Sequence, residues 1–156
     1  MVESTVVARS IAIYTAQTMP ERSIFVDTGY FVALLNGRDS LHGQAVALAS
    51  KWKKAKRSFI THDAVLIELA NFFARSALRS STLVAIRRIR AAVDWNVQCV
   101  DAALLARSER RYGAHVDKEW SLTDCISMEV MADFDSTEAA TPDKHFAQAG
   151  FRVLMR

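Results

Sequence analysis

The sequence predicts an α/β fold, a three-layer α/β/α sandwich around a central, mainly parallel sheet of four to five strands. Short apolar segments rich in β-branched and aromatic residues alternate along the chain with longer segments of helical periodicity. Alternating strands and helices form parallel sheets that helices cover on both faces. With 156 residues, 51% of them hydrophobic, the chain has the length of one domain and enough apolar residues for its core.

The regular pattern starts at Ser23, so residues 23–156 are predicted to form the domain. Residues 1–22 are predicted to be an N-terminal extension. Its segment VVARSIAIYTA can form a strand or a short helix, and Pro20 then interrupts the chain.

Five short segments between the helices are predicted to be strands. The first has the clearest β propensity because it contains Ile, Phe and Val in succession. In chain order the strands are SIFVDT (23–28), RSFITH (57–62), WNVQCV (95–100), STEAAT (136–141) and FRVLM (151–155).

Seven segments are predicted to be helices: 29–36, 42–56, 63–78, 80–94, 101–113, 121–134 and 142–150. The third is amphipathic, with Val65, Leu69, Phe72 and Phe73 on neighbouring turns. Capping and breaking residues support several of the boundaries. They are Asp39 and Ser40 before the second helix, Ser80 or Ser81 at the fourth, Gly113 at the end of the fifth, Ser121 at the sixth and Pro142 at the last.

Composition narrows the classes of function. The formal net charge is +3, which permits nucleic-acid binding without predicting it. Cys99 and Cys125 form no CxxC pair and are predicted to be buried, reduced thiols, which argues against a zinc site or a disulfide framework. No apolar segment is long enough to span a membrane and no secretory signal is evident, so the expected location is the cytoplasm.

Four acidic residues stand where a site is expected in such a fold. Ligands of open parallel sheets collect at the carboxyl ends of the strands. Asp27 lies at the end of the first predicted strand, and Asp143 lies two residues past Thr141, just after the fourth. Glu68 lies in the apolar helix segment AVLIELANFF, where burying an unpaired charge is costly. Asp124 lies one turn into its helix, where Ser121 is the more natural cap, so the acid is surplus to structure.

Convergence of these carboxylates predicts a metal site. Crowded carboxylates repel one another, and a divalent cation relieves the repulsion. Hard oxygen ligands suit Mg²⁺ or Mn²⁺, and such an ion can activate water and polarise a phosphodiester. Taken singly, each acid also has a structural interpretation. Asp27 can be a turn residue, Glu68 can face solvent, and Asp124 and Asp143 can complement helix starts.

The set of motifs resembles the PIN-domain nuclease family, in particular the VapC-like toxins of type II toxin–antitoxin systems. The resemblance runs from about Ser23 to the C-terminus. The segments that carry it are IFVDTGYFVALLNGRDSLHGQA, VLIELANFF, DKEWSLTDCISMEVM and ATPDKHFAQAGF, in this order.

The resemblance implies an Mg²⁺- or Mn²⁺-dependent endoribonuclease. Asp27, Glu68 and Asp124 would be metal ligands, and Asp143 would complete the group through water. Four supporting residues lie beside them, Thr28, Thr123 and Ser121 as orienting groups and Asp117 as an outer acid. The implied partners are an RNA substrate, a cognate antitoxin protein and a second copy of the chain in a homodimer.

Other features are weaker. The basic run KWKKAKR (51–57) is better explained as a solvated helix end than as a phosphate-binding patch. The four histidines share no metal-ligand spacing, although His145 follows Asp143 closely enough to lie near the site. Two other functions share the fold or the acids: a catalytically inactive module that binds RNA or protein, and a metal-dependent phosphatase acting on small phosphoesters.

Overall fold

A computed structural model describes residues 23–156, so the predicted extension 1–22 lies outside the described residues and the domain boundary stays a prediction. Five parallel strands form one sheet in the order β3-β2-β1-β4-β5. They are β1 (Ile24–Val26), β2 (Phe59–His62), β3 (Trp95–Gln98), β4 (Glu138–Ala140) and β5 (Arg152–Val153). The predicted fold class is confirmed, with a sheet that is entirely parallel.

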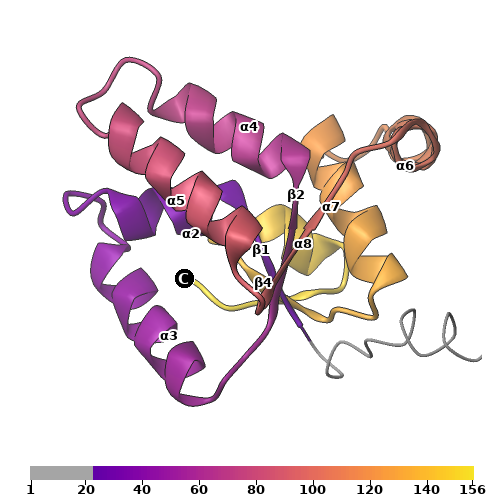
Figure 1. Ribbon diagram of the computed structural model, residues 1–156. Helices are drawn as coiled ribbons and strands as arrows, with labels where there is room; N and C mark the ends of the chain where they lie inside the picture. The colour runs from indigo at the N-terminus through magenta and orange to yellow at the C-terminus, as the bar shows by residue number, and fades with distance from the viewer. Residues whose placement is uncertain (1–22) are drawn as a thin grey trace, which may run out of the picture.

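Seven helices flank the sheet in the described part of the chain. They are α2 (Thr28–Leu35), α3 (His42–Lys54), α4 (Asp63–Phe72), α5 (Arg79–Ala91), α6 (Ala102–Ala114), α7 (Leu122–Asp133) and α8 (Lys144–Gln148). Helices α3 and α5 lie on one side of the sheet, and α6 and α7, which pack on each other, lie on the other (Figure 1). None of the described helices has the length and apolarity that crossing a membrane requires.

The core is centred on β1, whose three residues are fully buried. A strand covered by helices on both faces has no solvent side, which explains its continuous apolar sequence. The ring of Phe25 lies between those of His62 and Phe146, with centroids 5.7 and 5.9 Å away. Through these ring contacts the end of β2 and the start of α8 pack against the central strand.

The chain order across the sheet reverses between β1 and β4. The first three strands progress outward on one side of β1, and the chain then returns to place β4 on the other side. Such a reversal leaves a crevice at the carboxyl ends of the two strands, because their following segments run to different faces. Asp27 and Asp143 follow these two strands.

Helix α4 is shorter than predicted, ending at Phe72, and residues 73–78 form turns and the approach to α5. Val65, Leu69 and Phe73 are buried as expected, but Phe72 is 62% exposed. The buried face of α4 also includes Leu66, which shifts its centre away from Phe72.

Several predicted helix boundaries are wrong. Ser80 and Ser81 lie inside α5, which starts at Arg79 without a side-chain cap. Neither Asp39 nor Ser40 caps α3. Asp39 instead accepts a hydrogen bond from the backbone N–H of Leu41 (2.8 Å) in the turn before this helix. Gly113 lies within α6, which continues to Ala114.

Two other local expectations have mixed outcomes. Pro142 precedes the N-cap residue Asp143, so it lies just before α8 and not inside it. Cys125 is fully buried as predicted, whereas Cys99, which directly follows the end of β3 at Gln98, is exposed. The expected N-cap of α7, Ser121, is confirmed.

Candidate active site

A pocket of about 490 Å³ opens at the crevice between β1 and β4. Among its lining residues are all four acids singled out from the sequence, Asp27, Glu68, Asp124 and Asp143. Its other lining residues are Thr28, Gly29, Glu119, Ser121, Thr141, Pro142 and His145. Among the described residues, no Lys or Arg side chain lines this pocket, so none of them offsets the carboxylates with a fixed positive charge.

Asp27 occupies the step from β1 to α2. Its backbone N–H donates to the carbonyl of Ala140 (3.2 Å), which continues the pairing of β1 with β4. Its side chain does not cap α2 but accepts a hydrogen bond at Oδ2 from the hydroxyl of Thr141 (2.7 Å). Burial raises the pKa of Asp27 to about 6, although the hydrogen bond from Thr141 opposes that rise.

Glu68 reaches the pocket from the exposed face of α4. Its exposure agrees with the alternative that Glu68 faces solvent, because Leu66 and Leu69 take the buried positions of the helix. The hydroxyl of Thr28 donates to Oε2 of Glu68 (2.8 Å) and fixes this carboxylate against the start of α2.

Asp124 has a structural role that the sequence interpretation denied it. It forms a capping box at the start of α7: its backbone N–H donates to Oγ of Ser121 (3.0 Å), and its Oδ2 accepts from the backbone N–H of Ser121 (2.7 Å). The box orients the carboxylate toward the pocket. Burial raises the pKa of Asp124, and the nearby charge of Asp143 raises it further.

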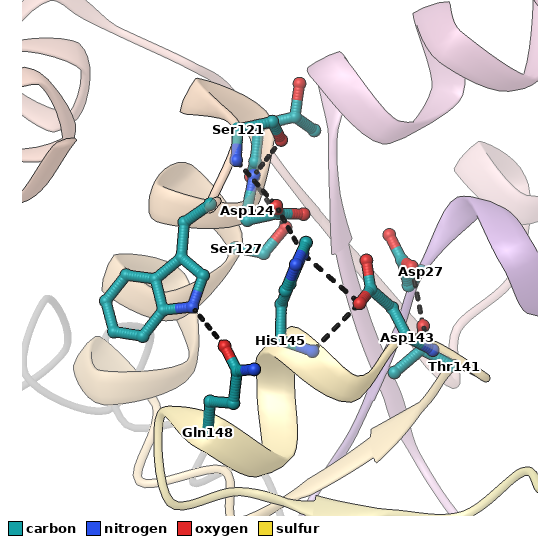
Figure 2. Close-up of polar contacts among 10 residues, drawn as sticks. Asp27, Ser121, Asp124, Ser127, Thr141, Asp143, His145 and Gln148 are labelled. Carbon is teal, nitrogen blue, oxygen red and sulfur yellow. Dashed lines mark hydrogen bonds and ion pairs between the residues drawn. The ribbon is translucent and has the colours of Figure 1, made fainter. Parts of the chain in front are cut away.

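Asp143 is the N-cap of α8, where its Oδ1 accepts from the backbone N–H of His145 (2.8 Å). Its own backbone N–H donates to Oγ1 of Thr141 (3.0 Å). The Thr141 hydroxyl therefore holds Asp27 through one hydrogen bond and the backbone of Asp143 through another (Figure 2).

His145 lies between two of the acids (Figure 2). Its Nδ1 is 3.4 Å from Oδ2 of Asp124 and 3.2 Å from Oδ1 of Asp143. This nitrogen is buried, and in the described part of the chain it has no hydrogen-bond partner. One ligand atom from each of Asp124, Asp143 and His145 can be chosen so that all three lie within 4.8 Å of one another.

Gly29 allows the two sides of the pocket to meet. A Cβ atom at this position would lie 2.6 Å from Cδ of Pro142, closer than atoms of two side chains can approach. The start of α2 can therefore rest against the loop from β4 to α8 only with glycine at position 29.

Two predicted supporting residues do not line the pocket. Asp117 is exposed and pairs with Lys118 (3.0 Å), and Glu119, two residues later, lines the pocket instead. Thr123 contributes its backbone carbonyl to the hydroxyl of Ser127 (2.9 Å). Thr28 and Ser121 do line the pocket, each holding one of the acids.

No prediction from the sequence included Thr141, Gly29 or Glu119 in the site, and none gave His145 a role there. The available signal for Thr141 is its place as the last residue of the fourth predicted strand, because that position lies at the same sheet edge as Asp27.

The donor set fits a divalent cation. Five carboxylates, those of the four predicted acids and of Glu119, line one pocket together with the imidazole of His145. The charges of Asp124 and Glu68 each raise the pKa of Asp27. Carboxylate oxygens are the ligands that Mg²⁺ and Mn²⁺ prefer. Nδ1 of His145 is buried beside two of the carboxylates and has no hydrogen-bond partner among the described residues, which is consistent with a further group binding in the pocket.

Comparison with known proteins identifies the family. Residues 24–152 match the PIN domain, a stretch that contains the first four strands, the first residue of β5 and the four acids. The chain belongs to the PIN-domain family. The resemblance seen in its sequence motifs is confirmed.

One relative and two solved structures are similar to this PIN domain. The chain is 31% identical over 128 residues to the 23S rRNA-specific endonuclease VapC20 of Mycobacterium tuberculosis, which covers 82% of this chain and 95% of VapC20. The crystal structure of VapC20, described as a sarcin–ricin loop cleaving toxin, matches with a TM-score of 0.72 and 30% identity, covering 83% of this chain and 96% of that one. FitAcB from Neisseria gonorrhoeae matches with a TM-score of 0.57 at 19% identity, over 83% of this chain and 95% of that one, and supports the fold alone.

Proposed function

We propose that this PIN-domain protein is an endoribonuclease that depends on Mg²⁺ or Mn²⁺ and acts as the toxin of a toxin–antitoxin pair. The observation that carries the proposal is the convergence of four carboxylates, from the ends of β1 and β4 and from α4 and α7, on one pocket that no Lys or Arg of residues 23–156 lines. Similarity to an rRNA-specific endonuclease over most of the chain supports RNA as the substrate. Since that substrate is RNA, we expect the protein to act in the cytoplasm.

In this proposal Asp27, Glu68 and Asp124 hold the cation, and Asp143 acts on it directly or through water. A bound divalent cation supplies Lewis-acid chemistry by polarising the phosphodiester and activating water, which gives a 5′-phosphate and a 3′-hydroxyl. The surrounding hydroxyls keep the carboxylates in place. Thr141 fixes Asp27 and Thr28 fixes Glu68, each through one hydrogen bond.

Substitution of one ligand tests the proposal. The full chain should cleave a synthetic sarcin–ricin loop RNA in the presence of Mn²⁺ or Mg²⁺, and cleavage should stop when EDTA is added. Asp27→Asn keeps the shape of the side chain and an acceptor for Thr141 but removes the charge, so we expect cleavage to fall by about a thousandfold or more. Asp117→Asn, a change of the same type outside the pocket, should leave the rate unchanged.

Other outcomes favour the competing functions. RNA binding without cleavage in either cation would favour an inactive binding module. Turnover of p-nitrophenyl phosphate with indifference to RNA would favour a phosphatase. Loss of cleavage in both Asp27→Asn and Asp117→Asn would contradict the assignment of this pocket.

The toxin role implies two protein partners. We expect expression of the chain to arrest growth, and co-expression of the cognate antitoxin to relieve the arrest. We also propose that the protein is a homodimer. The exposed apolar side chains of Ile67 (58%) and Phe72 (62%) on α4 support a surface that another chain covers. Light scattering on the purified chain measures its oligomeric state.

A further inference from the structure

We propose that His145 is a cation ligand through Nδ1, together with Asp124 and Asp143, and that this nitrogen makes the pocket prefer Mn²⁺ to Mg²⁺. The inference rests on the proposed function, since it concerns the same pocket. It adds a ligand of a different chemical type to the carboxylates, and a consequence for the choice of metal.

The geometry around Nδ1 is that of neighbouring ligands on one cation. Ligands at right angles around an octahedral ion, with bonds of about 2.1 Å, lie about 3.0 Å from each other. Nδ1 of His145 is 3.2 Å from Oδ1 of Asp143 and 3.4 Å from Oδ2 of Asp124. Small movements of these side chains would bring all three atoms onto one ion.

The ring nitrogen lies against the acids of the pocket: Nδ1 is within ion-pair distance of Asp124 and Asp143. A buried nitrogen without a hydrogen-bond partner lowers the stability of a protein. Nδ1 is such an atom within the described residues, although two carboxylates lie close to it. A cation between the ring and the carboxylates would satisfy all three groups at once.

The backbone holds the ring in place for this role. Asp143 caps α8 by accepting a hydrogen bond from the backbone N–H of His145, so the histidine and one of its neighbouring acids are fixed to each other. The next residue, Phe146, is fully buried and stacks on Phe25 of β1. The position of the imidazole is therefore tied to the central strand and does not depend on a flexible surface segment.

A nitrogen ligand changes which cation is favoured. Mg²⁺ prefers oxygen ligands and keeps its waters, whereas first-row transition metals accept imidazole nitrogen more readily. A site made of carboxylates alone would discriminate little between Mg²⁺ and Mn²⁺, because the two ions take similar coordination geometries. Replacing the imidazole by a side chain with an amide oxygen should therefore weaken Mn²⁺ much more than Mg²⁺.

Pulsed electron paramagnetic resonance on the Mn²⁺-loaded full chain tests the proposal directly. With ¹⁵N-labelled histidine, we expect a nitrogen coupling to bound Mn²⁺ in the wild-type protein. The coupling should vanish in His145→Gln and persist in His115→Gln, which changes a histidine outside the pocket. The wild-type measurement needs no substitution, so a variant that fails to fold leaves the test intact.

Calorimetric titration supplies the second readout. We expect His145→Gln to weaken Mn²⁺ binding about tenfold or more and Mg²⁺ binding less than threefold. Mn²⁺ binding without nitrogen coupling, or an unchanged ratio of the two affinities, would overturn the inference. RNA cleavage by the same wild-type preparation distinguishes this inference from the proposed function. Cleavage without nitrogen coupling would contradict His145 as a ligand but leave the proposed function in place. Coupling without cleavage would support His145 as a ligand and contradict the proposed function.

Discussion

Thr141 has a single hydroxyl that connects two of the acidic residues. It donates to Oδ2 of Asp27 and accepts from the backbone N–H of Asp143, at 2.7 and 3.0 Å. Because this hydroxyl is fully buried with the rest of its residue, the two hydrogen bonds are shielded from water. The side chain of Asp27 and the backbone at Asp143 are therefore held in a fixed relation before any cation arrives.

Asp27 is the acid of the site whose ionisation is most clearly disfavoured by folding. Without a cation its pKa in the folded protein is about 6, against 3.8 for an unperturbed Asp, chiefly because of burial. Folding favours the protonated form of a carboxyl group whose pKa it raises, so the contribution of that group to stability is fully present below its unfolded pKa. The contribution is lost as the pH rises through the folded pKa, because the folded protein must then bury the ionised form. At neutral pH the ionised Asp27 therefore destabilises the cation-free protein.

Asp27→Asn should then stabilise the cation-free protein at neutral pH. We expect the free energy of unfolding in EDTA to rise by about 1–3 kcal/mol at pH 7.5, because the variant has no charge to bury. Near pH 4 the two proteins should be nearly equal, since Asp27 is then mostly protonated. Urea unfolding at both pH values measures this, and a variant that is less stable at pH 7.5 would contradict it.

At the scale of elements, the site depends on close contact between the start of α2 and the loop from β4 to α8. Gly29 is the contact point, since an added Cβ would lie 2.6 Å from Cδ and 3.0 Å from Cγ of Pro142. Moving this loop also moves Thr141 and Asp143, which lie on either side of Pro142.

Gly29→Ala should damage both stability and activity. We expect a loss of about 1–3 kcal/mol from overpacking. RNA cleavage should fall roughly tenfold to a hundredfold, because the acids are displaced. Gly43→Ala in α3, where a Cβ meets nothing within 4 Å, is the matched control and should be neutral or slightly stabilising. Equal activity in the two variants, measured at saturating Mn²⁺, would show that the loop contact does not position the site.

Local sequence signals predicted elements better than they predicted their ends. Ser121 caps α7 because its hydroxyl and the Asp124 carboxylate satisfy each other's backbone groups. Ser80 and Ser81 carry the same chemistry but fall inside α5, because the turn after α4 closes earlier through Ser76. A serine near a helix start is a common signal, and tertiary packing decides which one is used.

For the whole molecule, sheet order is what assembles the pocket. β1 and β4 are neighbours although more than a hundred residues separate them, and the reversal of strand order places the crevice between them. Helices α4 and α7 then bring Glu68 and Asp124 to the same opening. The acids thus come from four separate segments of the chain.

The alternation of strands and helices was enough to predict the fold class and the placement of Asp27 and Asp143 at one edge. The order of the strands could not be predicted, since it depends on which connections cross over β1. The exposure of Glu68 depends on which face of α4 packs inward, and the apolar run around it is ambiguous. The nearness of His145 to Asp124 depends on contacts between α7 and α8, which no spacing in the sequence reveals.

The central claim is that these distant acids share a cation. Crystals of the full chain soaked in Mn²⁺ and measured at the manganese absorption edge test it most directly, because the anomalous signal locates the ion without reference to activity. We predict a peak in the pocket within bonding distance, about 2.0–2.3 Å, of oxygens from at least two of Asp27, Glu68, Asp124 and Asp143. Crystals that show no peak in this pocket at saturating Mn²⁺, or a peak only elsewhere on the protein, would contradict the account.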